Sequence, residues 1–130
     1  MLRPKALDHV GLKVDDLDKT LYFYQALGLE LLRVTGPKSD GSRIAVLRVG
    51  AQELNVFSAP GASTVQAASE RIDHFCLEME AASPEALAAD LRHAGIEVVR
   101  GPIARREGKS FFVLDPDGVH VELLLKQERG

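Results

Sequence analysis

A chain of 130 residues is long enough for one compact domain with a hydrophobic core, and too short for two independent domains of ordinary size. Its 45% hydrophobic and 27% charged residues are typical of globular proteins, and its net charge of -3 argues against nucleic-acid binding through phosphate contacts. The single cysteine, Cys76, excludes an internal disulfide and a zinc site built from several thiolates.

The start of the sequence has no apolar run typical of a secretory signal, and no later stretch approaches the roughly 20 apolar residues of a membrane span. A single cysteine also fits a reducing compartment. We therefore expect a cytoplasmic protein that binds neither membranes nor nucleic acid.

One eight-residue pattern occurs twice in the chain. Residues 7–14 read LDHVGLKV and residues 72–79 read IDHFCLEM, so that His9 and His74 are 65 residues apart. Polar and apolar residues alternate in both copies, which predicts a half-buried strand with its histidine on the same face each time. The chain therefore consists of two related modules.

The first module is predicted to have the element order βαβββ. Asp15 and Asp16 offer side-chain oxygens that cap a helix, which runs to about Leu27 and ends at Gly28. Three strands are then expected, over residues 29–34, 43–49 and 52–57. The module covers about residues 6–58, and a connector rich in Ala, Ser and Gly follows over residues 59–71.

The second module, over about residues 72–125, repeats this order. Ser83 is expected to cap a helix that starts at Pro84 and ends at Gly95. Strands are expected over residues 96–100, 110–114 and 119–125. A basic loop is expected over residues 101–109 and a turn over residues 115–118.

Two modules that are each too small to bury a sheet face are best explained as halves of one domain. We predict an α+β fold in which both modules form one curved mixed sheet around a cavity, with the helices outside. The sequence LGLELLR at residues 27–33 matches AGIEVVR at residues 94–100, an offset of 67 residues. The same offset aligns Asn55 with Glu122 in the last strand of each module. The cavity is therefore expected to receive His9, Asn55, His74 and Glu122.

These four residues predict a metal site. Two histidines and a carboxylate from three strands bind a divalent metal ion through three positions and leave others open for substrate or water. Asn55 adds a neutral carbonyl oxygen as a fourth ligand. The mixed nitrogen and oxygen donors are compatible with Fe, Mn, Ni, Co or Zn and do not choose between them. The alternative is a pocket lined by the same polar groups without a metal.

Two further residues are candidates for proton transfer in the substrate pocket. His120 shares a strand face with Glu122, and it is a general acid or base if it reaches the cavity. Glu53 is its counterpart in the first module. The alternative for both is a partly solvated position near the start of a strand.

The pocket is also expected to contain aromatic and basic groups. One ring of the pair Phe111 and Phe112 should line it. Four basic residues gather near the predicted loop: Arg100, Arg105, Arg106 and Lys109. This group, with Arg105 as the pocket candidate, either holds carboxylates or phosphates of a substrate or is solvated loop charge.

Four sequence motifs, spread over about residues 6–125, relate the chain to a known family. They are LDHV at residues 7–10, Phe23–Tyr24 before LGL at residues 27–29, IDH at residues 72–74, and DPDG at residues 115–118 followed by Glu122. In these motifs the chain resembles the vicinal oxygen chelate superfamily. That superfamily includes glyoxalase I, extradiol dioxygenases, methylmalonyl-CoA epimerase, and fosfomycin- and bleomycin-resistance proteins.

The resemblance implies a function as well as a fold. It implies metal ligands at His9, His74 and Glu122 and a variable fourth ligand at Asn55, where glyoxalase I and the epimerase usually have Glu or Gln. It implies a glyoxalase-like lyase or isomerase, in which one divalent metal ion chelates two adjacent oxygens of a small substrate and stabilises an enediolate. Glu122 would move the proton, and a homodimer is expected by the same resemblance.

Two other functions remain open within the superfamily. One is an Fe(II) extradiol-type dioxygenase, although such enzymes usually have a tyrosine where Phe112 falls and a histidine donor that residues 101–110 lack. The other is a protein of the bleomycin-resistance type that binds a drug or metabolite and needs no metal.

Overall fold

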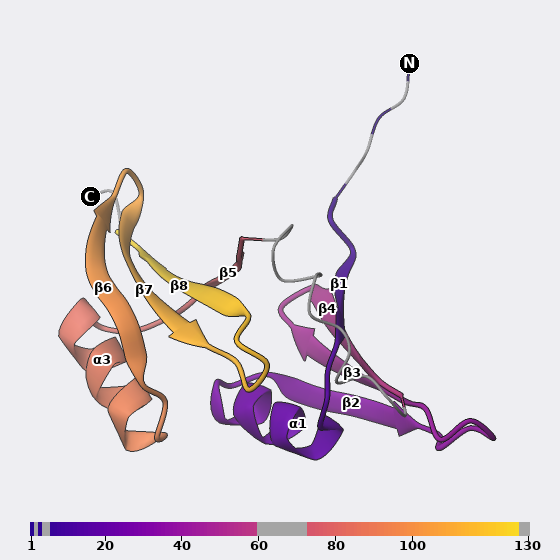
Figure 1. Cartoon of the computed structure of the whole chain (residues 1–130). Coiled ribbons are helices and arrows are strands. Elements are labelled where there is room, and N and C mark those ends of the chain that lie inside the picture. The colour runs from indigo at the N-terminus through magenta and orange to yellow at the C-terminus, as the bar shows by residue number, and fades with distance from the viewer. Residues whose placement is uncertain (2, 4–5, 60–72, 128–130) are drawn as a thin grey trace. The chain divides into compact units, whose positions relative to one another are not determined.

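Each half of the chain folds with the order βαβββ (Figure 1). The computed structural model describes residues 1, 3, 6–59 and 73–127, and divides the chain into two units, Met1–Gln66 and Ala67–Gly130. The predicted α+β fold of two βαβββ modules is confirmed. The predicted connector lies outside the described residues from position 60 onward.

The described residues of the first unit form one helix and four strands. They are β1 (His9–Lys13), α1 (Leu17–Ala26), β2 (Glu30–Thr35), β3 (Arg43–Val49) and β4 (Gln52–Ser58). The sheet has the order β1-β4-β3-β2, in which β1 and β4 are parallel and the other neighbours are antiparallel. The last strand of the unit therefore lies between the first and the third.

The second unit repeats this arrangement. Its elements are β5 (Phe75–Glu78), α3 (Pro84–His93), β6 (Val98–Arg105), β7 (Gly108–Leu114) and β8 (His120–Lys126). The order is β5-β8-β7-β6, with β5 and β8 parallel. Neither helix in the described ranges is long and apolar enough to cross a membrane.

Both helices begin at the residues that the sequence predicts. The side chain of Asp16 accepts a hydrogen bond from the Lys19 amide, and that of Ser83 accepts one from the Ala86 amide. These bonds satisfy amides that lack partners within the first turn of a helix. Capping by a side-chain oxygen therefore fixes the start of each helix.

Both helices also end in the same way. Gly28 and Gly95 have positive φ angles of 107° and 77°. The amide after each glycine bonds back five residues along the chain, from Leu29 to the Tyr24 carbonyl and from Ile96 to the Leu91 carbonyl. This is the Schellman arrangement, in which a left-handed residue stops the helix and turns the chain into the next strand.

Strand pairing assigns the side chains of β7 and β8 to the two faces of the second sheet. Four side chains on one face are almost completely buried: Phe111, Val113, Val121 and Leu123. Helix α3 lies beside β6 and buries Leu87 and Leu91 (Figure 1). The opposite face carries Phe112 and Glu122, and we call it the charged face of the second sheet.

The first and last strands of each unit pair in the same register. Gly11 pairs with Asn55 in the first unit, and Cys76 pairs with Glu122 in the second. Gly11 and Cys76 are each two residues after a histidine. The alignment that the repeat predicts for Asn55 and Glu122 is therefore reproduced by the backbone.

The predicted basic loop over residues 101–109 is wrong. Strand β6 continues to Arg105, and β7 already begins at Gly108. Gly101 and Pro102 suggested a loop, but the pairing with β7 passes them through a register irregularity between Arg100 and Ile103. Hydrogen bonds to a neighbouring strand therefore override the local turn signal, and Arg105 lies on a strand.

Gly101 makes the irregularity possible and generates a test of the fold. Its φ angle is +115°, and a Cβ atom there would lie 2.6 Å from the Ser110 carbonyl oxygen. Gly101→Ala should lower the free energy of unfolding by more than the roughly 1–3 kcal/mol of backbone strain alone, because the paired strand must also move. Urea unfolding measures this loss.

Substitutions at two other glycines distinguish the cost of backbone strain from the cost of the steric clash of the added Cβ atom. Gly28 has a φ of +107° with no atom within 4 Å of the added Cβ, so Gly28→Ala should show the strain alone. Gly11 has open space and no positive φ, so Gly11→Ala should change stability little. A loss for Gly101→Ala no larger than that for Gly28→Ala would contradict the steric explanation.

Candidate functional site

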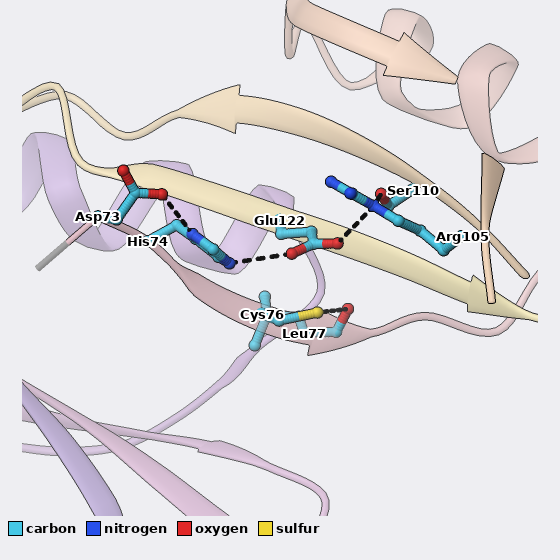
Figure 2. A network of polar contacts seen from close by, with 7 residues as sticks. All are labelled: Asp73, His74, Cys76, Leu77, Arg105, Ser110 and Glu122. Atoms are coloured by element: carbon cyan, nitrogen blue, oxygen red, sulfur yellow. Dashed lines mark hydrogen bonds and ion pairs between the residues drawn. The ribbon is translucent and has the colours of Figure 1, made fainter. Parts of the chain in front are cut away.

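The centre of the charged face is the contact between His74 and Glu122. His74 lies directly before β5, and Glu122 lies near the middle of β8, which is paired with β5 on one side and β7 on the other. The His74 Nε2 atom is 3.1 Å from Glu122 Oε1 (Figure 2). Glu122 is only 9% exposed, so its charge depends on nearby partners rather than on water.

An aspartate fixes the orientation of the His74 ring. The His74 Nδ1 atom is 2.7 Å from Asp73 Oδ2, and this hydrogen bond lowers the pKa of Asp73 below its ordinary value. Because an ionised carboxylate only accepts hydrogen bonds, Nδ1 is the donor. In a neutral ring Nε2 then has the lone pair, and the Glu122 Oε1 atom lies 3.1 Å from it.

Two lone-pair atoms only 3.1 Å apart are stabilised by a cation between them, which is either a proton or a metal ion bound to both atoms. Ligands at about 2.1 Å from one metal ion are separated by roughly 3 Å when they are cis to each other. The donor types, the spacing and the Asp73 contact, which is typical of metal-bound histidines, all fit a divalent metal ion.

The second oxygen of Glu122 faces a guanidinium group. Arg105 Nε lies 3.5 Å from Glu122 Oε2 and donates a hydrogen bond to Ser110 Oγ at 2.9 Å (Figure 2). Ser110 is fully buried in β7, so its hydroxyl is held in place. Glu122 thus presents one oxygen to His74 and the other to Arg105.

Phe112 lies beneath these polar groups. Its ring meets that of His74 edge to face, with centroids 5.5 Å apart. The guanidinium carbons of Arg100 and Arg105 are each 5.7 Å from the Phe112 centroid. Phe112 is 7% exposed, and it supports a cluster of three polar side chains on the charged face.

The first unit contains an equivalent pair, His9 and Asn55, in which an amide replaces the carboxylate. His9 lies on β1, and its Nδ1 is 2.9 Å from Asp8 Oδ2, as in the His74 arrangement. Asn55 Oδ1 is buried, and no hydrogen-bond partner for it exists among the described residues. A buried amide oxygen without a partner is costly, so Asn55 is suited to contact a bound group.

The remaining pocket candidates, His120 and Glu53, make no described contact with His74 or Glu122. His120 is exposed at the start of β8, opposite Leu114. Glu53 pairs with His9 across β1 and β4 and is partly buried. The structure thus brings together His74, Glu122, Phe112 and Arg105, whereas His9, Asn55 and Glu53 belong to the other unit.

Cys76 lies beside Glu122 but is poorly suited to be a nucleophile. Partial burial of the thiol, together with the negative charge of Glu122, raises the pKa of Cys76 to about 11. A thiol with such a pKa is almost fully protonated near pH 7, and the thiolate is the reactive form.

Over residues 1, 3, 6–59 and 73–127, no group of three or more His, Cys, Asp or Glu side chains gathers in metal-binding geometry. Each unit offers a pair of potential donors: His9 with Asn55, and His74 with Glu122. The pair on the charged face is the better defined, because its two donor atoms are already 3.1 Å apart.

Sequence reasoning missed the residues that orient the site. Asp8 and Asp73 have no predicted role, although both histidines follow an aspartate and the repeated Asp-His dipeptide was a usable signal. Ser110 gave no such signal. Its contact with Arg105 depends on the β6–β7 hairpin, which the sequence predicted as a loop.

Comparisons with known proteins agree with this architecture. A family model described as the Glyoxalase/Bleomycin resistance protein/Dioxygenase superfamily matches residues 6–123. A glyoxalase domain-containing protein of Mycosarcoma maydis, RDO1, is 29% identical over 136 aligned residues, which cover 98% of this chain and 72% of that protein.

Solved structures are similar over nearly the whole chain. A glyoxalase family protein from Enterococcus faecalis has 28% identity and a TM-score of 0.71, covering 92% of this chain and 96% of its own. The trypanothione-dependent glyoxalase I of Leishmania major has 25% identity and a TM-score of 0.74, covering 94% and 87%. A fosfomycin resistance protein from Listeria monocytogenes, at 20% identity and a TM-score of 0.75 with 96% of both chains covered, shares the fold.

The contact between Arg105 and Glu122 is testable by a double-mutant cycle. In chelator-treated protein, Arg105→Met keeps an apolar stem on Phe112 but leaves the Glu122 carboxylate, 12% exposed, with His74 alone. We expect a loss of about 1–3 kcal/mol in the free energy of unfolding, and a clearly smaller loss when Glu122→Gln is already present. Urea unfolding of the four proteins gives the coupling energy.

An exposed pair in the first unit is the matched control. Arg48 and Glu30 pair across β2 and β3 with side chains 52% and 60% exposed. The cycle of Arg48→Met and Glu30→Gln should give a coupling energy below about 1 kcal/mol, because water screens this pair. Equal coupling energies in the two cycles would show that burial does not strengthen the contact between Arg105 and Glu122.

Proposed function

Because the chain belongs to the Glyoxalase/Bleomycin resistance protein/Dioxygenase superfamily, we propose that it is a metal-dependent lyase or isomerase of the glyoxalase type. Its substrate is a small molecule with two adjacent oxygens. The observation that supports this best is the pair of facing acceptors, His74 Nε2 and Glu122 Oε1, 3.1 Å apart. An orienting aspartate and a nearly buried carboxylate make this pair suited to hold a cation.

The proposed metal ligands come from both halves of the chain. They are His9, His74 and Glu122, with Asn55 as a fourth and weaker ligand. Asp8 and Asp73 would orient the two imidazole rings through Nδ1, which leaves each Nε2 as the ligand atom. The donor set accepts Ni, Zn, Mn, Fe or Co, so the identity of the divalent ion is open.

When bound, the metal ion acts as a Lewis acid that stabilises negative charge on the substrate oxygens. Glu122 is the proposed catalytic residue, because its carboxylate is on the charged face and can carry a proton between two substrate atoms. Phe112, with His74 and the stacked guanidinium groups on it, would form the pocket wall and limit the entry of water. His120, Glu53 and Arg105 are the remaining pocket residues of this proposal.

The proposal also covers the binding partners, the oligomeric state and the cellular location of the protein. Its partner is a small-molecule substrate, and neither nucleic acid nor a membrane is involved. A homodimer and a cytoplasmic location are proposed from the family resemblance and from the composition of the sequence.

Metal binding is the first test. Purified untagged protein should take up about one divalent ion per chain, measured by elemental analysis and by titration calorimetry with Ni, Zn, Mn and Co. His74→Ala should abolish this uptake because it removes a ligand. Asp73→Asn should weaken it by about 10–100-fold, because the orienting carboxylate is lost but the ligand remains.

Two substitutions away from the charged face serve as controls. His93→Ala removes an exposed histidine at the end of α3, and Asp90→Asn removes an exposed carboxylate from the same helix. Both should leave metal uptake unchanged. Wild-type protein that refuses all four ions, or a His74→Ala variant that binds like wild type, would instead favour a metal-independent binding protein.

The reaction class is the second test. An enzyme that moves a proton next to a carbonyl group exchanges that proton with solvent, so loaded protein in D₂O should introduce deuterium into the correct 2-oxo or 2-hydroxy compound of a panel. Nuclear magnetic resonance follows this exchange. Glu122→Gln should lower it by at least about 100-fold, because the amide cannot accept the proton.

Oxygen consumption distinguishes the competing reaction. A catechol panel with Fe(II)-loaded protein in an oxygen electrode should show no uptake above that of His74→Ala protein. Oxygen uptake by the wild type, without solvent exchange in any compound, would assign the chain to the dioxygenase class.

A further inference from the structure

The charged face holds two guanidinium groups that the proposed proton transfer does not use. Arg100, Phe112 and Glu122 pair in one row across β6, β7 and β8. The row places Arg100 about 10 Å from Glu122 along the sheet, two strand spacings away. Arg105 reaches the same Phe112 ring from further along β6.

Arg105 is held by one edge of its guanidinium group. Its Nε donates to Ser110 and lies beside Glu122, as Figure 2 shows. Within the part of the chain that the structure describes, its Nη1 and Nη2 atoms have no hydrogen-bond partner, and the side chain is 36% exposed. A guanidinium fixed at Nε presents two parallel N–H groups, which match the two oxygens of a planar carboxylate.

The charges of the cluster are not balanced. Glu122 supplies one negative charge, whereas Arg100 and Arg105 supply two positive charges. Arg100 forms no ion pair with any described residue, and its guanidinium group stacks on Phe112. An excess of one positive charge above a buried ring attracts a monoanion, and the Glu122 carboxylate disfavours a dianion such as a phosphate ester.

We propose that Arg105 and Arg100 form a carboxylate-binding subsite beside His74 and Glu122. The substrate would therefore carry a carboxylate in addition to the two oxygens at the reacting centre. This inference rests on the proposed function for the position of that centre. If Arg105 were only the counter-ion of Glu122, its Nε edge would be sufficient and Arg100 would have no role. A carboxylate-binding subsite uses both arginines.

Three hydroxamates test this subsite, because a hydroxamate presents two adjacent oxygens to a metal ion. The probes are acetohydroxamate, malonohydroxamate with its added carboxylate, and the uncharged amide of malonohydroxamate. Calorimetry with metal-loaded protein should show that malonohydroxamate binds at least about tenfold more tightly than its amide, the range expected for charge-assisted hydrogen bonds. The amide and acetohydroxamate should bind about equally.

Variants assign this preference to the proposed residues. Arg105→Gln should reduce the preference for malonohydroxamate to about onefold, and Arg100→Gln should reduce it in part. Arg105→Lys keeps the charge without the fork and should retain only part of the preference, which also guards against misfolding of the glutamine variant. Each variant is loaded to equal metal occupancy before titration.

Arg106→Gln is the matched control. Arg106 lies in the turn between β6 and β7 and is exposed, so its replacement removes the same charge from the same hairpin. It should leave the preference unchanged. An equal loss for Arg106→Gln, no preference in the wild type, or tighter binding of a phosphonate analogue than of malonohydroxamate would overturn the proposal.

A titration without metal separates this inference from the proposed function. Addition of sodium acetate to metal-free protein should shift the Arg105 Nε–H resonance, and sodium chloride at equal concentration should not. If no hydroxamate binds but acetate still shifts this resonance, the proposed function fails and the subsite stands. If hydroxamates bind without a preference and acetate has no effect, the subsite fails and the proposed function stands.

Discussion

The arrangement of each unit depends on the parallel pairing of its first and last strands. Parallel neighbours need a crossover connection, and here a helix and two further strands provide it. The pairing places β8 between β5 and β7, where Glu122 is surrounded on both sides. A slip of one residue would turn Glu122 to the helix-covered face, so the register of this pair determines whether the charged face exists.

Within that register, the chemistry of the charged face follows from how Glu122 divides its two oxygens. Oε1 faces a histidine whose other nitrogen is bound by Asp73, and Oε2 faces the Nε edge of Arg105. These two contacts offset the cost of placing a polar side chain at 9% exposure. The guanidinium also shares the negative charge, so a metal ion at His74 would hold Glu122 less firmly than an unpaired carboxylate.

The sequence predicted what local chemistry or the internal repeat determines. Side-chain caps at Asp16 and Ser83 fix the helix starts because these contacts involve neighbouring residues, and the repeat aligned Asn55 with Glu122 as the strand pairing does. The contact between Arg105 and Ser110 could not be predicted, because Gly101 indicates a loop as long as the pairing of β6 with β7 is unknown. Whether His9 and Asn55 share a site with His74 stays a prediction.

The two units use the same backbone register for different chemistry. The row Cys76, Glu122, Phe112 and Arg100 corresponds to Gly11, Asn55, Val46 and Arg33 in the first unit. Val46 offers no ring on which Arg33 can stack, and Asn55 offers no charge. The proposed donors therefore carry one negative charge in total, from Glu122, against the two positive charges of a metal ion. With Arg100 and Arg105 included, the positive charges beside a bound metal ion outnumber the single negative charge of Glu122, which favours a substrate that is itself an anion.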